Sequence, residues 1–262
     1  MVVCNPNPID LKGLINSPPA PVSNEDENVV PSVTARLLVD CRCHLGECVI
    51  WDDRENAVLF TSILDRKFHK LFLPSDGNTT LKSYSFDKMI CAFGLLDGPY
   101  GPSPLLDDDK FQQKDNSPGY IVAWEDGFQL YDLEGGRAIT SMSQGEIVNG
   151  SGPASRLNDG RVDPTGKYFV CGGCASDIPM KVYKCEYEST TKTLKHTVIY
   201  DKIWTTNSIC WSLTGKEMYL ADSKTINIRK FDYNLNSGTL TNERVMHEKK
   251  VGVADGYVVV IG

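Results

Sequence analysis

Residues 156–167 read R-L-N-D-G-R-V-D-P-T-G-K, and this stretch decides the fold because its features return one repeat later. Asn158 is followed 49 residues later by Asn207, which is followed 48 residues later by Asp255. The turn glycines Gly166 and Gly215 also lie 49 residues apart. A period near 50 residues fits one four-stranded blade of a β-propeller. The spacing therefore predicts an all-β propeller.

Short runs of β-branched and aromatic residues extend this pattern through the chain from residue 35 onward. Residues 57–61, 119–124 and 217–221 are examples, each bounded by turn-forming residues. An Asp-Gly pair at 126–127 predicts a tight hairpin between two such runs. No segment carries an amphipathic helical stripe over three turns. We expect all-antiparallel sheets joined by regular hairpins.

Two segments fall outside the strand pattern. Residues 1–34 are rich in Pro, Asn and acidic side chains, which predicts a disordered arm before a propeller domain at 35–262. Residues 96–118 contain too many prolines to pair in a sheet. This second segment is predicted to be a surface insertion or, alternatively, a lid over a site.

Composition excludes some classes of partner. The chain has 262 residues, a net charge of −7 and a pI near 5.2, which argue against a sequence-independent nucleic-acid binder. No apolar run approaches the roughly 18 residues needed to span a bilayer. The first eight residues lack the pattern of a signal peptide, so a cytoplasmic location is expected. The sequence carries no signal for an oligomeric state.

Cysteine and histidine give no sign of a soft-metal site. The nine cysteines are an odd number, and a chain without a signal sequence is expected to keep them reduced. Cys171 and Cys174 have the spacing of half a zinc or redox site, but no second pair matches them. We interpret both as structural thiols. The four histidines form no pair at metal-ligand spacing.

One oxygen-bearing side chain in each of several blades predicts a shared site on the propeller axis. Glu47, Asn158, Asn207 and Asp255 are the candidates, since carboxylate and amide oxygens suit a divalent cation such as Ca²⁺. The competing interpretation is that Asn and Asp merely form turns, as they commonly do. Glu47 is the hardest to explain in that way, because a carboxylate beside an apolar run needs a partner if it is buried.

The sequence resembles the gluconolactonase and regucalcin family. Residues 156–167 match its central pattern R-x-N-D-G-x-x-D-x-x-G-[RK]. Residues 46–51 are similar to its opening G-E-x-P-x-W, with Val49 in place of proline. Residues 206–212 resemble S-N-G-x-x-W-S, with Ser208 in place of glycine. Residues 219–223 and 253–256 resemble the family's Y-x-x-D-S and P-D-G segments.

The resemblance implies a six-bladed propeller that hydrolyses sugar lactones with one divalent cation. The cation is expected to be Ca²⁺, with Zn²⁺, Mn²⁺ or Mg²⁺ as alternatives, and its implied ligands are Glu47, Asn158, Asn207 and Asp255. Arg156 and Asn158 would contact the lactone, and Asp255 would also act as general base. The alternatives are a non-catalytic calcium-binding propeller and an organophosphate ester hydrolase on the same scaffold.

Beyond these single substitutions, the sequence departs from the family pattern in two larger respects. A further substrate-contacting acid, expected after the R-x-N-D-G blade, has no match within residues 174–181. Propellers of this family also continue for nearly two more blades, whereas this chain ends seven residues after Asp255. We therefore expect a C-terminally truncated propeller with its last blades missing or partial. A five-bladed ring is the alternative.

Overall fold

The computed structural model describes residues 37–95, 97–98, 101–102, 119–143, 155–188, 190–225 and 227–248. Every helix or strand assigned in these ranges is a β-strand, so the all-β prediction is confirmed. The described residues contain no helix, and therefore no helix that is long and apolar enough to cross a membrane. The predicted arm at 1–34 and the candidate ligand Asp255 lie outside the described residues.

In the described ranges, four antiparallel sheets of four strands each form one blade. The first blade contains β1 (Gly46–Asp52), β2 (Ala57–Ser62), β3 (Lys67–Phe72) and β4 (Thr80–Ser85). The second contains β5 (Ile90–Leu95), β8 (Tyr120–Trp124), β9 (Gly127–Asp132) and β10 (Arg137–Ala138). The third contains β11 (Arg156–Val162), β12 (Phe169–Cys174), β13 (Met180–Glu188) and β14 (Thr193–Ile203). The fourth contains β15 (Thr206–Trp211), β16 (Glu217–Asp222), β17 (Asn227–Asn234) and β18 (Thr239–Glu248).

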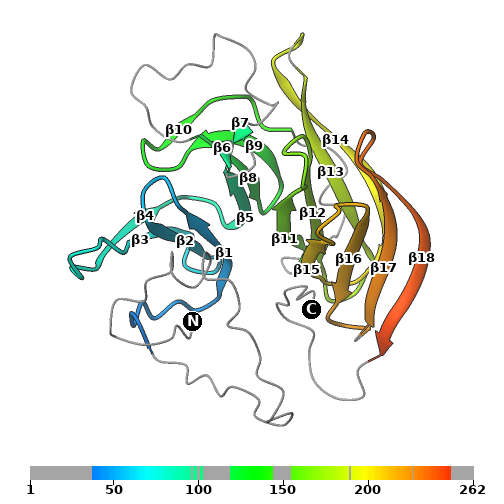
Figure 1. The fold of residues 1–262 in the computed structure, drawn as a ribbon, viewed down its shortest axis with the longest axis horizontal. Helices are drawn as coiled ribbons and strands as arrows, with labels where there is room; N and C mark the ends of the chain where they lie inside the picture. The colour runs from blue at the N-terminus through cyan, green and yellow to red at the C-terminus, as the bar shows by residue number, and fades with distance from the viewer. Residues whose placement is uncertain are drawn as a thin grey trace, which may run out of the picture.

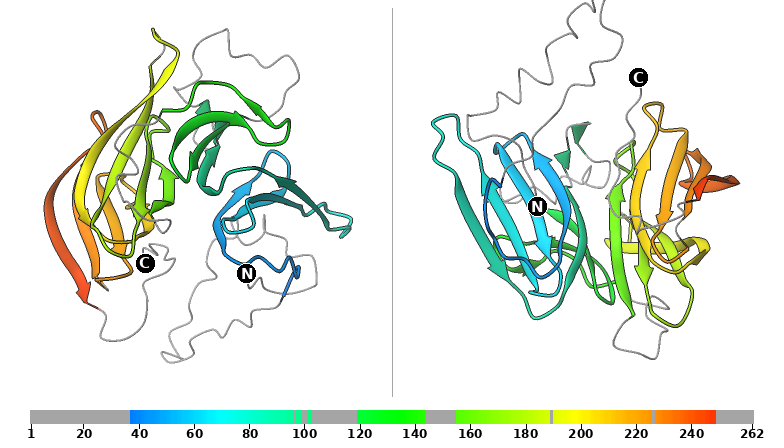
Figure 2. Two further views of the ribbon diagram at one scale, coloured as in Figure 1. Left: turned by 180° about the vertical axis from the view of Figure 1, so that it is seen from behind. Right: turned by 90° about the horizontal axis from the view of Figure 1, so that it is seen from below.

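The blades follow one another around an arc (Figure 1). The first strand of each blade, β1, β5, β11 or β15, lies innermost, and β5 contacts β1 on one side and β11 on the other. Strand β15 in turn contacts β11. Seen from behind and from below, the arc remains open between the first and fourth blades among the described residues (Figure 2). In the described residues the chain forms part of a six-bladed-type propeller, as the sequence predicts.

The hydrophobic core is divided into layers between neighbouring blades. One cluster, including Phe68 and Phe93, joins the first and second blades. A second cluster, including Phe128 and Phe169, joins the second and third blades. A third, including Val182, joins the third and fourth blades. Burial of apolar surface between blades therefore stabilises their order around the arc.

Turns account for much of the sequence repeat. Gly166 and Gly215 both have φ near +70°, where a side chain would be strained, and each N–H closes a turn onto the carbonyl three residues earlier. The hairpin predicted at Asp126–Gly127 is present but one residue earlier, because Trp124 pairs with Gly127. Inside the proline-rich segment, β6 (Asp97–Gly98) pairs with β7 (Gly101–Pro102), so our expectation of no pairing there is wrong.

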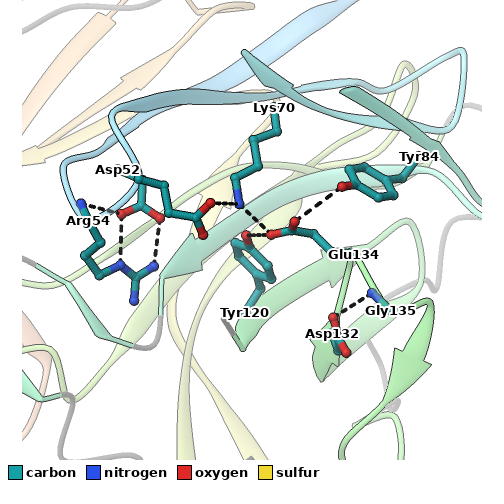
Figure 3. A network of polar contacts seen from close by, with 9 residues as sticks. Asp52, Arg54, Lys70, Tyr84, Tyr120, Asp132, Glu134 and Gly135 are labelled. Atoms are coloured by element: carbon teal, nitrogen blue, oxygen red, sulfur yellow. Dashed lines mark hydrogen bonds and ion pairs between the residues drawn. The ribbon is translucent and has the colours of Figure 1, made fainter. Parts of the chain in front are cut away.

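An ionic cluster joins the first two blades (Figure 3). Lys70 on β3 is fully buried, and its Nζ lies 2.7 Å from both Glu55 Oε2 and Glu134 Oε1. Tyr120 and Tyr84 donate hydrogen bonds to the two oxygens of Glu134, at 3.1 Å and 3.3 Å. Because Glu134 follows β9, this cluster fixes the second blade against the first.

Candidate functional site

The candidate ligands lie near the beginnings of the innermost strands. Glu47 is the second residue of β1, Asn158 the third of β11 and Asn207 the second of β15. In each case a β-bulge interrupts the pairing at or just after the candidate, between Glu47 and Ile50, between Leu157 and Gly160, and between Asn207 and Ile209. A bulge redirects a side chain and is common beside functional sites. Each of the three candidates therefore lies at or beside a bulge.

The backbone turns into a left-handed conformation directly after two of the three candidates. Cys48 and Ser208, which directly follow Glu47 and Asn207, have φ values of 53° and 52°. Residues with a Cβ seldom adopt this left-handed region. The preference for glycine at the position of Ser208 in the resembling pattern thus has a physical explanation.

Asn158 connects the third blade to the fourth. Its side chain is buried, and Nδ2 donates to the Thr206 carbonyl at 2.7 Å, next to Asn207 on β15. Its Oδ1 accepts a hydrogen bond from Arg156 Nη1 at 2.6 Å. The same guanidinium nitrogen donates to the Leu157 carbonyl at 2.8 Å. The structure therefore brings Arg156, Asn158 and the Asn207 segment together.

Asn207 is held by the neighbouring strand of its own blade. Its Nδ2 donates to Ser223 Oγ at 2.9 Å. Asp222, fully buried, accepts hydrogen bonds from the N–H groups of Trp204 and Thr205 at 3.2 Å and 3.1 Å, and so fixes the approach to β15. Sequence reasoning noted the Asp-Ser pair at 222–223 as a motif but gave it no role. Its role is to orient the strand that carries Asn207.

Glu47 is half-buried at the start of the first blade. Its backbone carbonyl accepts a hydrogen bond from Thr61 Oγ1 at 3.3 Å, and β1 contacts β11 as well as β5. Asp65 fixes the preceding residues, because its carboxylate accepts from the His44 N–H at 3.0 Å and from Ser62 Oγ at 2.5 Å. These hydrogen bonds lower the pKa of Asp65, so it is ionised at neutral pH.

Asp159 links the inner strands of the third and fourth blades. The Gly160 N–H donates to its Oδ1 at 2.8 Å, and the N–H groups of Ser208 and Ile209 also hydrogen-bond to its carboxylate. Burial raises the pKa of Asp159, while these donors and Arg161 oppose the shift. The N-D part of the central motif thus combines a candidate ligand, Asn158, with an acid that joins two blades.

Arg156 also lies beside thiols of the second and third blades. Its guanidinium hydrogen-bonds to Cys91, yet burial dominates and raises the pKa of Cys91 to about 12. Burial likewise raises the pKa of Cys171 and of Cys174. Both cysteines lie on β12, so the interpretation of this pair as structural thiols agrees with their positions.

The donor set matches the preferences of a hard divalent cation. The described candidates offer one carboxylate, that of Glu47, and two amide side chains, those of Asn158 and Asn207, and oxygen ligands of this kind suit Ca²⁺. Within the described ranges, no three His, Cys, Asp or Glu side chains gather closely enough to hold a metal. A site here would therefore depend on the amide oxygens.

Known proteins with related sequences or folds include regucalcins and gluconolactonases. Regucalcin from Danio rerio is 25% identical over 230 residues, covering 86% of this chain and 68% of its own length. The solved structure of regucalcin, described as a calcium-binding protein, from Agrobacterium tumefaciens superposes with a TM-score of 0.57 at 22% identity. That match covers 78% of this chain and 59% of the other.

A gluconolactonase structure from Xanthomonas campestris superposes with a TM-score of 0.51 at 13% identity, covering 81% of this chain and 65% of the other. This chain thus spans less than two thirds of the two solved structures. The family model described as the SMP-30/gluconolactonase/LRE-like region matches residues 45–260, so the chain belongs to that family.

Proposed function

We propose that this protein is a divalent-metal-dependent hydrolase of sugar lactones. The observation that carries the proposal is the repeated geometry of β1, β11 and β15, each of which presents an oxygen-bearing side chain at a bulge near its beginning. Family membership supports the same conclusion. We further propose a cytoplasmic location, which the free thiols of the eight described cysteines support.

Glu47, Asn158 and Asn207, with Asp255, would hold the cation, expected to be Ca²⁺ with Zn²⁺, Mn²⁺ or Mg²⁺ as alternatives. When bound, the cation would polarise the lactone carbonyl and make a water molecule more acidic. Asp255 would accept the proton of that water as general base.

Arg156 would bind the substrate through its fork of N–H donors, which matches hydroxyl and carboxylate oxygens. Its Nη1 already donates to the Leu157 carbonyl and to Asn158 Oδ1, and these bonds orient the guanidinium. Asn158 would contact both cation and lactone, so that substrate position depends on the occupied metal site.

A second candidate function is non-catalytic calcium binding. It is favoured by the same two hydrogen bonds of Arg156, because they engage part of the guanidinium with the protein itself. Hydrolysis of organophosphate esters on this scaffold is a third possibility that the same assay measures.

The test is hydrolysis of glucono-δ-lactone, and of an organophosphate ester, before and after removal of metal with a chelator. We expect chelation to abolish lactone turnover, and Ca²⁺, Zn²⁺, Mn²⁺ or Mg²⁺ to restore it. Asp255→Ala should lower kcat by about 100-fold or more. The exposed Asp53→Ala is the matched control and should retain full activity. Tight Ca²⁺ binding without turnover would instead establish the second function. Near-normal turnover by Asp255→Ala would show that Asp255 is not the general base.

A further inference from the structure

Two cysteine thiols lie close together just before β1, in the residues that precede the candidate ligand Glu47. Cys43 Sγ donates a hydrogen bond to Cys41 Sγ at 3.4 Å, and both residues are half-buried. Arg42 between them has a φ of 48°. A residue with a Cβ adopts this left-handed conformation at an energetic cost, and such outliers are common at functional positions. Here the conformation turns the chain between the two thiols.

A histidine faces the pair from the first blade. His69 Nε2 lies 3.8 Å from Cys43 Sγ, and its Nδ1 lies 2.8 Å from Ser83 Oγ. The ring stacks on Phe60 with centroids 4.8 Å apart, so it is held in place. Burial lowers the pKa of His69, which favours the neutral imidazole. With Nδ1–H donated to Ser83, Nε2 is free to accept a proton from Cys43.

We propose that Cys41 and Cys43 form a redox-active dithiol that closes reversibly into a disulfide by exchange with a small disulfide such as oxidised glutathione. Cys41 attacks one sulfur of glutathione disulfide and releases one glutathione. Cys43 then passes its proton to His69 and attacks Cys41 Sγ, which breaks the mixed disulfide, and the second glutathione leaves with the proton that His69 gives up. In total two protein thiols are oxidised, one disulfide is reduced to two thiols, and the two protons leave with the glutathiones.

The order of these steps follows from the surroundings of Cys43. Burial, together with its hydrogen bond to Cys41, raises the pKa of Cys43 to about 11, so this thiol needs a base before it can attack. The neighbouring Cys48 is half-buried, its Sγ hydrogen-bonds to the backbone of Phe93 on β5, and desolvation raises its pKa to about 12.

The experiment incubates the full chain in glutathione buffers of increasing oxidised fraction, blocks free thiols with iodoacetamide and analyses tryptic peptides by mass spectrometry. Trypsin cuts after Arg36, Arg42 and Arg54, which places Cys41 and Cys43 on separate peptides. We expect peptides 37–42 and 43–54 to remain joined, with the loss of two hydrogens (about 2 Da), and dithiothreitol to separate them. Incomplete cleavage after Arg42 would give one peptide, 37–54, with the same mass loss.

Matched variants decide which thiols are linked. Cys41→Ser and Cys43→Ser should each abolish the joined species, whereas the same change at the remote Cys210 should leave it intact. His69→Ala should let the glutathione adduct on Cys41 accumulate, because the second step slows. Persistence of the joined peptides in Cys43→Ser would assign the bond to Cys48 and overturn the proposal. Alkylation of Cys41 and Cys43 as separate free thiols in the wild type, at every glutathione ratio, would also overturn the proposal.

Discussion

Single backbone conformations shape the candidate site at the residue scale. Ser208 follows Asn207 with a φ of 52°, and its side-chain oxygen is buried with no hydrogen-bond partner among the described residues. A left-handed conformation and an unpaired buried hydroxyl both destabilise the folded state. Serine occupies this position in the present chain, so the protein is less stable than it would be with a residue that avoids both costs.

Replacing this serine by glycine should therefore stabilise the protein. We expect Ser208→Gly to raise the free energy of unfolding by about 1 kcal/mol, because glycine adopts positive φ freely and removes the unpaired hydroxyl. Urea denaturation measures the effect. Ser85→Gly, at an exposed strand position with ordinary φ, is the control and should be destabilising. A Ser208→Gly variant that is less stable than the wild type would show that the hydroxyl has a role in the fold.

Elements are held to one another by both apolar layers and buried charge. Lys70 on β3 contributes a fully buried ammonium to the interface of the first two blades, with Glu55 and Glu134 as partners. Burial and the Glu134 carboxylate raise the pKa of Tyr84 to about 12, so this phenol stays protonated as a hydrogen-bond donor to Glu134. The buried ammonium thus has two carboxylate partners, and both oxygens of Glu134 accept hydrogen bonds.

Removing the ammonium should be costly because it leaves two carboxylates facing each other. We expect Lys70→Met to lower the free energy of unfolding by about 3 kcal/mol, since losing one partner of a buried ion pair leaves uncompensated charge. The control is Lys195→Met, which breaks the exposed pair with Glu188 and should change stability by less than about 0.5 kcal/mol. Equal effects of the two substitutions, measured by urea denaturation, would show that the interface does not depend on the Lys70 charge.

At the scale of the whole molecule, the candidate ligands come from blades far apart in sequence. Glu47 lies on β1 and Asn207 on β15, the innermost strands of the first and fourth blades, between which the arc is open in the described part of the chain (Figure 2). A cation bound by both Glu47 and Asn207 would join the two ends of the arc. Binding that occurs only in the folded state stabilises it by mass action.

Calcium should therefore raise the melting temperature of the wild type. At a concentration 100 times the Kd, the gain in free energy of unfolding is about 2.7 kcal/mol. Glu47→Gln should blunt the rise, because glutamine preserves the shape and one oxygen but removes the charge. The control is Glu188→Gln, at a half-buried glutamate of the third blade that pairs with Lys195, and it should leave the rise unchanged. The same calcium-induced shift in wild type and Glu47→Gln would remove Glu47 from the ligand set.

The sequence alone determined the fold class and the positions of the repeated strands. Asn158 and Asn207, 49 residues apart, do lie near the beginnings of β11 and β15, and Gly166 and Gly215 do occupy matching turns. This was predictable because each blade is an antiparallel sheet of consecutive or nearly consecutive strands. Because hairpins join strands that are neighbours in sequence, a repeat of blades in space is also a repeat of residue spacing along the chain. Family membership followed from the same motifs.

Only the tertiary structure decided which side chains meet. The contacts of Lys70 with Glu134 and of Asp159 with Ser208 join different blades, and nothing in the local sequence specifies such a partner. The approach of Cys43 to His69 likewise depends on how the residues before β1 pack on the first blade. The bulges that set Glu47 and Asn207 could not be predicted either, because serine and cysteine seldom adopt positive φ. Packing between blades fixes these contacts and backbone conformations, because a closely packed interior excludes the other conformations that the local sequence would permit.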